Sequence, residues 1–395
     1  MDALILVSNP GSESRKYALY RGEDCLATVH FEHLGKDIVY SIEALGKVTQ
    51  TQKSGLHHLS FAPTKVWDIL EKETGVKNKY DVKIVVVRVV APSSYFAQHR
   101  ALDKQALAKL KALESYARLH VHASLQEIEL LGGAFPGVRL VGASDSAFHM
   151  GRPEHTNRYG IPAKDADNLD IKRFSYHGLS ARSVIDQLRG ADKLPQRLVI
   201  AHLGSGVSVM AIKSGKSFDS TMGFSPLEGP VMATRSGSID PTAAQALKQG
   251  LKLSDNELQD YLNHQSGLLG LSGTSSDIRD LLKHEADADK NAKLALKIYA
   301  YKVQQAIGQM TASLGGLDTL VFTGTVGERS AVMRSRIVSK LLYLGLSLNP
   351  QANHETGGVK GVASISPPRH PAKVYVVHAD ETAQMSKVAQ EFLPK

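Results

Sequence analysis

Two similar segments, far apart in the chain, each combine an apolar strand, a turn of glycine and small hydroxyl residues, and a second strand. They are LILVSNPGSESRKYALY (4–20) and LVIAHLGSGVSVMAIKSGK (198–216), and the second closes on Ser214-Gly215, a pair typical of tight hairpins. Because glycine has no side chain, its backbone N–H can approach an anion closely. One such unit alone would be an ordinary hairpin, but the repetition predicts a phosphate-binding protein built from two duplicated domains.

The length and composition of the chain restrict what it can be. At 395 residues it is too long for one typical hydrophobic core, which predicts two domains. The single cysteine, Cys25, excludes an intramolecular disulfide and a four-thiolate zinc site, and fits a reducing compartment. The N-terminus has no signal-peptide pattern, and the longest apolar run, IVVVRVV (84–90), is much too short to span a bilayer. We therefore expect a cytoplasmic protein that does not enter membranes.

The net charge of +8 raises the question of nucleic-acid binding. Lysines and arginines are spread along predicted helices beside acidic residues, as in ALDKQALAKLKALESYAR (101–118), and aromatic residues make up only 6% of the chain. Binding to single-stranded nucleic acid needs basic runs interleaved with aromatic residues, which this sequence lacks. The charge instead favours a surface that attracts small anionic substrates.

The order of predicted elements is α/β throughout. A polar stretch at 149–167, rich in glycine, proline, histidine and arginine, divides the two halves. In the first half we expect strands near 3–8, 17–21, 25–31, 83–90 and 138–143, and helices near 62–74, 103–117 and 122–132. In the second half we expect strands near 171–174, 196–213 (a pair), 319–324, 362–366 and 373–378, and a long loop at 214–239. We expect helices there near 179–189, 240–249, 254–263, 275–284 and 287–314, another helix from about 328, and a last helix from about Asp380.

A third glycine turn, FTGTVGERS (322–330), follows an apolar strand and precedes a predicted helix. The N-terminus of a helix in this position can hold an anion or a nucleotide. The sequence contains no GxxxxGK[ST] motif, and no GxGxxG segment follows a strand and opens a helix. P-loop NTPases and Rossmann-type dehydrogenases are therefore poor interpretations. The lack of HExxH or Cys/His ligand spacing also argues against zinc.

Longer segments carry a resemblance to a known family. The segment HLGSGVSVMAIKSGKSFDSTMGFSPLEGPVMATRSGSIDP (202–241) closely resembles the phosphate-loop and signature region of the acetate kinases. Further matches, in the family's order, are NPGSES-x-K (9–16), RVV (88–90), RLH (118–120), SDSAFH (144–149), IKRFSYHGLS (171–180) and the nucleotide loop FTGTVGE (322–328). The resemblance covers essentially the whole chain. It implies the actin-like, sugar-kinase-like (ribonuclease H-like) fold, in which two related α/β domains surround a cleft.

The resemblance also implies domain limits and a reaction. The N-terminal domain would comprise residues 1–148 with about 382–395, and the C-terminal, nucleotide-binding domain residues 149–381. The implied reaction is the reversible, Mg²⁺-dependent transfer of a phosphoryl group from ATP to a short-chain carboxylate, acetate first among them, with Mn²⁺ as an alternative metal. The products are ADP and an acyl phosphate, and the implied assembly is a homodimer.

Four residues match the catalytic positions of the family: Arg88, Asp145, His177 and Arg235. Both partners of such a transfer are anions, so catalysis depends on positioning and on neutralising charge. Arginine suits this task because its planar guanidinium binds carboxylate and phosphate oxygens through two bonds. Arg88 also stands out from the residues alone, since valines and an isoleucine surround it and a buried charge needs a partner. The resemblance assigns carboxylate binding to Arg88 and charge neutralisation to His177 and Arg235.

Further matches define metal, nucleotide and acyl sites. The implied metal residues are Asn9, Asp145, Asp380 and Glu381, with the choice between the last two left open. The implied phosphate and nucleotide residues are Ser12, Ser14, Lys16, His202, Gly204, Ser205, Gly206, Gly324, Thr325, Val326 and Gly327. The implied substrate-binding residues, which include a small apolar pocket for the acyl methyl group, are Val90, Leu119, His120, Tyr176 and Pro226.

From the residues alone, simpler interpretations stay open for several of these positions. Asp145 fits a helix N-cap as well as a metal site, and Asp380 and Glu381 fit the acidic first turn of a helix. The apolar pocket residues would otherwise be interpreted as core. Because Mg²⁺ takes few protein oxygens besides water and phosphate, a sparse Asn/Asp/Glu set is nevertheless chemically reasonable.

The chain departs from the family around both substrate sites. VRVVAPS (87–93) replaces the usual HRVVHGG, LHVH (119–122) replaces LHNP, and Tyr176 replaces a phenylalanine. Ser205 replaces an asparagine of the phosphate loop, and Thr325 replaces a glycine, where its β-carbon would crowd an adenosine that stacks on bare backbone. The alternatives left open are therefore pyrophosphate or another donor, a propionate- or butyrate-type acceptor, and a non-catalytic actin-like binding or regulatory protein.

Overall fold

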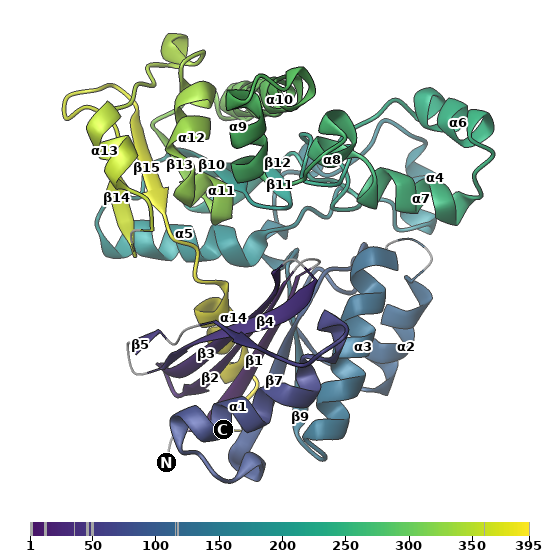
Figure 1. The fold of residues 1–395 in the computed structure, drawn as a ribbon. Helices are drawn as coiled ribbons and strands as arrows, with labels where there is room; N and C mark the ends of the chain where they lie inside the picture. Colours follow the sequence, from purple (N-terminus) through teal and green to yellow (C-terminus); the bar gives the residue numbers. More distant parts are fainter. Residues whose placement is uncertain are drawn as a thin grey trace. The chain divides into compact units, whose positions relative to one another are not determined.

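A computed structural model describes residues 3–11, 14–34, 36–44, 47–48, 51–114, 116, 118–358 and 360–394 (Figure 1). Of residues 47 and 118–120 it describes the backbone alone. The chain folds into two compact units, one comprising Met1–Ala147 with Asp380–Lys395 and the other Phe148–Ala379. Each unit contains its own β-sheet. Within the described ranges, no helix is long and apolar enough to cross a bilayer.

The sheet of the first unit has a parallel centre and an antiparallel flank. Its centre consists of β1 (Leu4–Pro10), β7 (Val82–Val89) and β9 (Arg139–Ser144), which are parallel neighbours in that spatial order. The flank beyond β1 consists of β2 (Ser14–Arg21), β3 (Asp24–Leu34) and β4 (Asp37–Ala44), with the short β5 (Lys47–Val48) and β6 (Gln52–Lys53) paired to β4. The short β8 (Arg100–Ala101) pairs antiparallel with β9.

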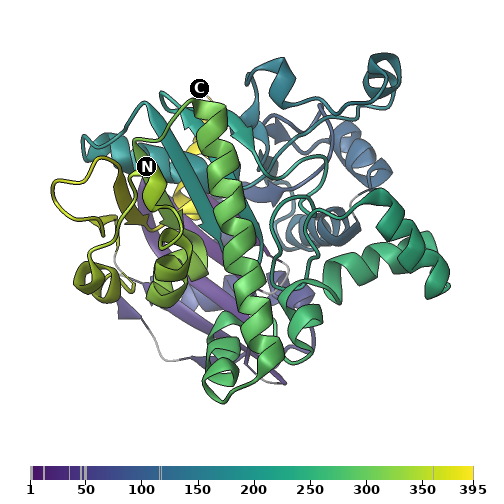
Figure 2. The ribbon, with the colours of Figure 1, turned by 90° about the horizontal axis from the view of Figure 1, so that it is seen from above.

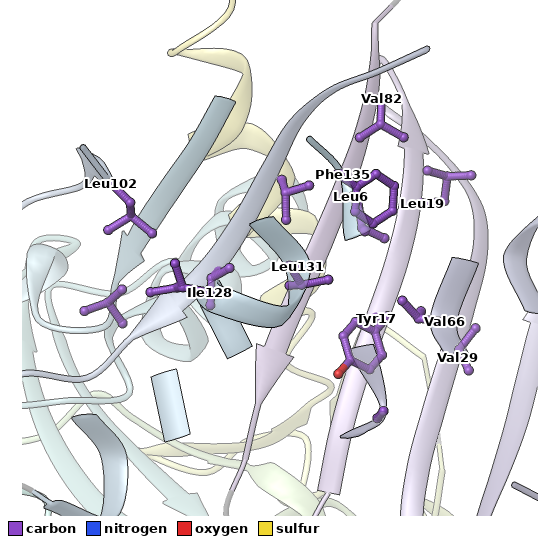
Figure 3. Packing of buried hydrophobic residues seen from close by; sticks show 14 of the residues in the cluster. Leu6, Tyr17, Leu19, Val29, Val66, Val82, Leu102, Ile128, Leu131 and Phe135 are labelled. Atoms are coloured by element: carbon purple, nitrogen blue, oxygen red, sulfur yellow. The ribbon is translucent and has the colours of Figure 1, made fainter. Parts of the chain in front are cut away.

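Different helices cover the two faces of this sheet. Alternate residues of β1 and β2, such as Leu6 and Leu19, form one buried cluster with Ile128 and Leu131 of α3 (Figure 3). Helix α3 (Arg118–Ala134) packs there beside α1 (Pro63–Thr74) and α2 (Lys104–Ala112). The last helix, α14 (Glu381–Gln390), packs on β1, β7 and β9. Because Tyr20 hydrogen-bonds Thr382 of α14 and is one residue out of phase with Leu19, α14 covers the opposite face.

The sheet of the second unit repeats this arrangement. Its parallel centre consists of β10 (Arg197–Leu203), β13 (Thr319–Thr323) and β15 (Lys373–Val377). Antiparallel strands on its two sides are β11 (Val207–Lys213), β12 (Lys216–Ser220) and β14 (Val362–Ser364). Helix α5 (Gly178–Gly190) buries Val184 and Leu188 against Leu198 and Ile200 of β10. The long α10 (Lys290–Leu314) lies along β10, β11 and β12 (Figure 2).

Local signals explain where the remaining helices begin. Asp240 caps an α-helix that has proline at its first position, Ser254 and Glu257 form a capping box, and Asp289 caps α10, which ends at the left-handed Gly315. The remaining α-helices of this unit are α4 (Ala163–Asn168), α6 (Pro241–Gly250), α7 (Asp255–His264), α8 (Gly267–Ser272), α9 (Ile278–Ala286), α11 (Gly324–Arg329), α12 (Ala331–Val338) and α13 (Pro350–Glu355).

The two sheets share one strand order. It runs β3-β2-β1-β7-β9-β8 in the first unit and β12-β11-β10-β13-β15-β14 in the second, with the same parallel and antiparallel pairings. Ser214 and Gly215 have φ values of 50° and 76° and close the predicted two-residue hairpin between β11 and β12. The duplicated, mixed α/β fold predicted from the repeated turns is thus confirmed.

Three local predictions are wrong. Residues 171–174 form no strand, because the N–H of Ile171 donates to Ala166 O in α4 and that of Arg173 donates to Asn157 O in a turn. The predicted loop at 214–239 contains β12, since the hairpin signal is followed by a short strand that pairs with β11. The helix expected at 103–117 ends at Ala112, and α3 begins earlier than expected.

Candidate functional site

Three predicted site residues lie at the carboxyl ends of adjacent parallel strands in the first unit. Asn9 is near the end of β1, Arg88 is near the end of β7, and Asp145 directly follows β9. The ladder pairs Arg88 with Ala143, two residues before Asp145. The carboxyl ends of parallel strands are where α/β proteins gather ligand-binding groups. Sequence positions far apart are therefore brought to one edge of the sheet.

Arg88 lies at the centre of this group. Its Nη2 donates to Asp145 Oδ2 at 2.8 Å, its Nη1 donates to Asn9 Oδ1 at 3.4 Å, and Nη1 lies 3.7 Å from Glu381 Oε2. Asn9 Nδ2 donates to the same Glu381 oxygen at 2.7 Å. The Asp145 side chain is fully buried and that of Arg88 is 14% exposed. These four side chains form one charged network.

Arg88 is charged in this environment. Burial disfavours the guanidinium cation, but the carboxylates of Asp145 and Glu381 more than offset it and raise the pKa of Arg88 above its ordinary value. The Nε atom of Arg88 is buried and has no hydrogen-bond partner among the described residues. A fixed cation with an unused donor is suited to bind a carboxylate or phosphate oxygen.

The two acidic residues at the start of α14 have different surroundings. Asp380 is the N-cap, and its Oδ1 accepts from the N–H of Ala383 at 2.9 Å and from Thr382 Oγ1 at 2.8 Å. Glu381 instead contacts Asn9 and Arg88. The geometry therefore favours Glu381 for a role at the site, and gives Asp380 the capping role that the sequence left open.

The donor set of this edge suits a hard divalent cation. Asp145 and Glu381 offer carboxylate oxygens and Asn9 offers an amide oxygen, which are donor types that Mg²⁺ takes. Over the described ranges, no group of three or more His, Cys, Asp or Glu side chains would hold a metal ion by itself. A metal at this edge would take its other ligands from water and phosphate, as Mg²⁺ usually does.

The other residues predicted in the first unit lie on neighbouring elements. Ser14 and Lys16 belong to β2, where Lys16 is exposed and is the ladder partner of Asn9. Val90 follows β7 and is buried. Ser12 lies outside the described residues, and of Leu119 and His120, in the first turn of α3, only the backbone is described.

In the second unit, the same edge of the sheet carries histidine and glycine. His202 lies near the end of β10, and its ladder partner Thr323 ends β13 and is followed at once by Gly324. The turn at 204–206 joins β10 to β11, and the N–H of its first glycine donates to the carbonyl of its second at 3.0 Å. Its middle residue, Ser205, is exposed.

His177 has a strained backbone at the start of α5. Its φ of 59° lies in the left-handed region, and Ser175, two residues earlier, has a φ of 64°. Ser175 is held on several sides, because its N–H donates to Gly223 O at 3.1 Å, its Oγ donates to Met222 O at 2.9 Å, and Arg152 Nη1 donates to its Oγ at 2.7 Å. Backbone strain of this kind persists only where the surroundings enforce it, and it clusters at functional sites.

The rings of His177 and His202 stack, with centroids 4.0 Å apart and planes inclined by 22°. Nδ1 of His177 is hydrogen-bonded to Ser208 Oγ at 2.9 Å, and Nδ1 of His202 to Ser180 Oγ at 2.8 Å. A β-carbon on Gly206 would lie 3.3 Å from His177 Nε2. The two hydroxyl groups thus orient the rings, and the Nε2 edge of His177 faces the glycine turn.

Arg235 reaches the same turn. A β-carbon on Gly206 would lie 3.1 Å from Arg235 Nη1, and the arginine is buried. The loop of Arg235 is tied to the turn because the N–H of Ala233 donates to Ser205 O at 3.1 Å. It is also packed against Gly267 (φ 64°), where a β-carbon would lie 2.8 Å from the backbone N and O of Arg235. Only glycine fits there, and the position of Arg235 is fixed accordingly.

The predicted nucleotide loop forms the first turn of α11. Gly324 has a φ of 76°, and a β-carbon there would lie 3.1 Å from His202 Nε2 and 2.8 Å from Leu203 O. This helix therefore begins directly against β10. Of the other predicted residues in the loop, Thr325 is exposed, Val326 half-buried and Gly327 buried.

Glu328 fixes this short helix from its other end. Its Oε1 accepts from the N–H groups of Gly324 at 3.0 Å and Ala379 at 3.3 Å, and its Oε2 lies 2.7 Å from His378 Nδ1. Burial acts to raise its pKa, but the hydrogen bonds from His378 and the two backbone groups prevail and lower the pKa of Glu328 below its ordinary value. The carboxylate is thus part of the structure that shapes the loop.

The predicted acyl-pocket residues of the second unit are buried. The Tyr176 hydroxyl, which the sequence places near the methyl pocket, donates to Phe224 O at 2.6 Å. This bond tethers the loop that carries Pro226, which is also buried. The hydroxyl gained at Tyr176 is therefore used within the protein.

Sequence reasoning missed three residues that shape this edge. All three, Ser180, Ser208 and Glu328, stand inside quoted motifs. Position in a motif was therefore the available signal for each of them. The hydrogen-bond partners themselves follow only from the packing of α5 and α11 against β10 and β11.

Comparison with known proteins identifies the family. A sequence model described as the acetokinase family matches residues 4–387. The chain belongs to the acetokinase family. The acetate kinase of Thermoanaerobacter pseudethanolicus is 34% identical over 98% of each chain. Among solved structures, an acetate kinase from Porphyromonas gingivalis has a TM-score of 0.83 at 30% identity and covers 99% of this chain and 100% of its own.

A propionate kinase from Francisella tularensis is equally similar, with a TM-score of 0.84 at 30% identity over 98% of each chain. The resemblance and the fold class predicted from the sequence are thus confirmed. So is the reaction class, since members of the acetokinase family are kinases that transfer phosphate between a nucleotide and a carboxylate. The pyrophosphate and non-catalytic alternatives are not favoured by these relationships.

Proposed function

We propose that this acetokinase-family chain catalyses the reversible, Mg²⁺-dependent transfer of the γ-phosphoryl group of ATP to acetate, which gives ADP and acetyl phosphate. The observation that carries the proposal is Arg88, a largely buried and charged guanidinium near the end of β7 that Asp145 holds in place and whose Nε is unused. Such a group binds a carboxylate well. The family match supports the same reaction.

In the first unit, Arg88 binds the acetate carboxylate and Asp145 orients the guanidinium. One carboxylate oxygen attacks the γ-phosphorus in line, and the bond from that phosphorus to the oxygen bridging to ADP breaks, so that no proton is transferred. Asn9, Asp145 and Glu381 would hold the metal. When bound, the metal supplies positive charge to the phosphate oxygens.

In the second unit, His177 and Arg235 neutralise the charge of the transferring group. Both approach Gly206, where the lack of a side chain leaves room for a phosphate oxygen. The backbone of the turn at 204–206 binds the nucleotide phosphates, and the start of α11 contacts the nucleoside. These assignments rest on the sequence resemblance together with the positions of the residues on one edge of the sheet.

The preference for acetate is the finest part of the proposal. One of the similar structures is a propionate kinase, so the family includes acceptors that differ by one methylene. A methylene in an apolar pocket changes kcat/KM by about 10- to 200-fold. The ratio of kcat/KM for acetate to that for propionate therefore measures this preference directly.

A hydroxamate assay of the purified protein tests the proposal. Acetate, propionate and butyrate are each paired with ATP, GTP and pyrophosphate, with and without Mg²⁺. We expect the highest kcat/KM for acetate with ATP, and no turnover without a divalent metal. No turnover in any pairing, or full activity of Arg88→Ala and Arg235→Ala, would contradict the proposal, whereas turnover with pyrophosphate alone would change the donor.

We also propose a homodimer in the cytoplasm, as the sequence resemblance implies. The single cysteine, Cys25, fits a reducing compartment. Light scattering coupled to size-exclusion chromatography measures the mass in solution. A monomeric mass that persists at all concentrations would contradict this part of the proposal.

A further inference from the structure

A buried charge lies beneath the β1–β2 hairpin, outside both site edges. Glu127 of α3 has a side chain that is 1% exposed, and its Oε1 accepts from Ser8 Oγ and from the Tyr17 hydroxyl, both at 2.7 Å. Its Oε2 lies 3.3 Å from Nη1 of Arg15, which is itself 7% exposed. We call these four residues the Glu127 cluster. Figure 3 shows Tyr17, the member of the cluster labelled there, among apolar side chains of the core.

Attachment of α3 to the sheet does not require this cluster. Ile128 and Leu131 of α3 are already buried in the apolar core of the unit. Burial raises the pKa of Glu127, although the attraction of Arg15 and the two hydroxyl bonds act to lower it. Burying this carboxylate therefore costs free energy that apolar contacts between α3 and the sheet would not cost. Apolar contacts have no preferred direction, whereas hydrogen bonds to a carboxylate do. The cluster therefore fixes the position of α3 relative to the β1–β2 hairpin rather than strengthening their association.

The register of the hairpin connects the cluster to the site. Asn9 and Lys16 form one pair of the β1–β2 ladder, and the pairs on either side of it contain the three strand residues of the cluster. Because side chains alternate along a strand, the cluster lies on one face of the hairpin, and Asn9 and Lys16 lie on the other. On that other face, Asn9 contacts Arg88 and Glu381.

We infer that Glu127 is a positioning residue for phosphoryl transfer, because it ties α3 to both strands of the hairpin and so fixes Asn9 relative to Arg88 and Glu381. The inference rests on the proposed function, in which Asn9 helps to hold the metal. Site residues have to be held within a fraction of an ångström, and the groups behind them supply that precision.

Two variants and a matched control test the inference. Tyr17→Phe removes one hydroxyl bond to Glu127 and keeps the packed ring. Glu127→Gln keeps the shape, removes the charge and leaves Arg15 without its counter-charge. The control is Tyr299→Phe in α10, since Tyr299 is fully buried and its hydroxyl has no hydrogen-bond partner within the described structure.

Calorimetry of Mn²⁺ binding in the presence of ADP, together with steady-state kinetics, provides the readout. Glu127→Gln should weaken Mn²⁺ binding and kcat by about 10-fold or more, with a smaller loss in Tyr17→Phe, as is usual for groups that orient metal ligands. The KM for ATP should rise by a smaller factor than the Mn²⁺ affinity falls, because the nucleotide loop and the turn at 204–206 lie in the second unit, although Ser14 and Lys16 lie on the hairpin. Tyr299→Phe should match the wild type.

Unchanged Mn²⁺ affinity in folded Glu127→Gln and Tyr17→Phe would overturn the inference. So would an increase in the KM for ATP as large as the decrease in Mn²⁺ affinity. If Glu127→Gln does not fold, Tyr17→Phe and Ser8→Ala decide the question, since each removes a single bond to the carboxylate. An inactive wild type would instead overturn the proposed function. The Mn²⁺ measurement would then still decide whether the cluster positions Asn9.

Discussion

In the first unit, the edge formed by β1, β7 and β9 ends in Asn9, Arg88 and Asp145, which are joined by hydrogen bonds and opposite charges. In the second unit, the equivalent strands β10 and β13 end in His202 and Thr323, beside the glycine turn at 204–206. The strand order is the same in both sheets. The residues at the strand ends are not.

The comparison shows that the duplicated fold fixes where the proposed ligand-binding groups lie but not which groups they are. A buried guanidinium needs a carboxylate, and Asp145 supplies one to Arg88. A bound phosphate needs open space beside donors, and Gly206 supplies it next to His177 and Arg235. The edge of the first unit therefore depends on paired charges, and that of the second unit depends on the space that glycine leaves. Substitutions at the two edges should therefore have different effects.

The largest effect is expected at the charged edge. Arg88→Ala should lower kcat/KM for acetate by about 10³-fold, and Arg88→Lys should still lose much of that, because lysine cannot replace the two-pronged donor. ADP affinity, measured by calorimetry, should change little in both variants. A comparable loss of ADP affinity would break the distinction between the two edges.

The next effect is expected at the glycine turn, where two glycines form a matched pair. Gly206→Ala places a β-carbon 3.1 Å from Arg235 Nη1 and should lower kcat/KM for ATP by about 10- to 100-fold, as expected for misplaced catalytic groups. Gly204→Ala meets its nearest atoms at 3.5 and 3.6 Å, which is ordinary contact, and should have a much smaller effect. Equal kinetics for the two variants would show that space at Gly206 is not what matters.

A smaller effect separates the two acids of α14. Glu381→Gln should raise the Mg²⁺ half-saturation constant by about 10-fold, because it removes a negative oxygen beside Asn9 and Arg88. Asp380→Asn should leave that constant unchanged, since asparagine also caps helices. Metal titrations of both variants provide the measurement, and the reverse order would assign the metal role to Asp380.

The smallest effect concerns stability and pH in the second unit. Folding lowers the pKa of Glu328, so its ionised form stabilises the fold fully above the ordinary glutamate value of 4.5, and this contribution is lost as the pH falls through the lower folded-state pKa. Urea unfolding between pH 7 and pH 3 should therefore show a steeper loss of stability on acidification in the wild type than in Glu328→Gln. At pH 7 the variant should be less stable by about 1.5 kcal/mol. Parallel pH profiles would mean that Glu328 does not shape the loop through its charge.

Much of the fold was predictable because its signals are local. The hairpin pair Ser214-Gly215, the helix cap at Asp240 and the apolar strand at 84–90 each act within a few residues of their own position. The strand proposed at 171–174 failed because the N–H groups of Ile171 and Arg173 donate to carbonyls of a helix and a turn, a pairing that the residues of this segment do not reveal. The break between α2 and α3 was predicted a few residues too late, at 118–121, since 103–117 is helical in composition throughout.

The candidate site was predictable in its residue types and less so in its partnerships. The matched motifs named Asn9, Arg88 and Asp145, which the structure brings together. They did not separate Asp380 from Glu381, and they gave no sign of Glu127. Both findings depend on contacts between side chains that are far apart in the sequence.

The sequence by itself determined the two glycine turns, the α/β order of elements, the family and the class of reaction. It could do so because motifs and hairpin signals each lie within a short segment of the chain. Only the tertiary structure decided that Asn9 donates to Glu381, 372 residues away, and that the buried carboxylate of Glu127 accepts hydrogen bonds from both strands beside the first turn. The physical reason is that both contacts join a helix to a distant strand. Alternation along β1 decides which face a side chain occupies, and the packing of α14 and α3 on those two faces decides which helix residue it meets.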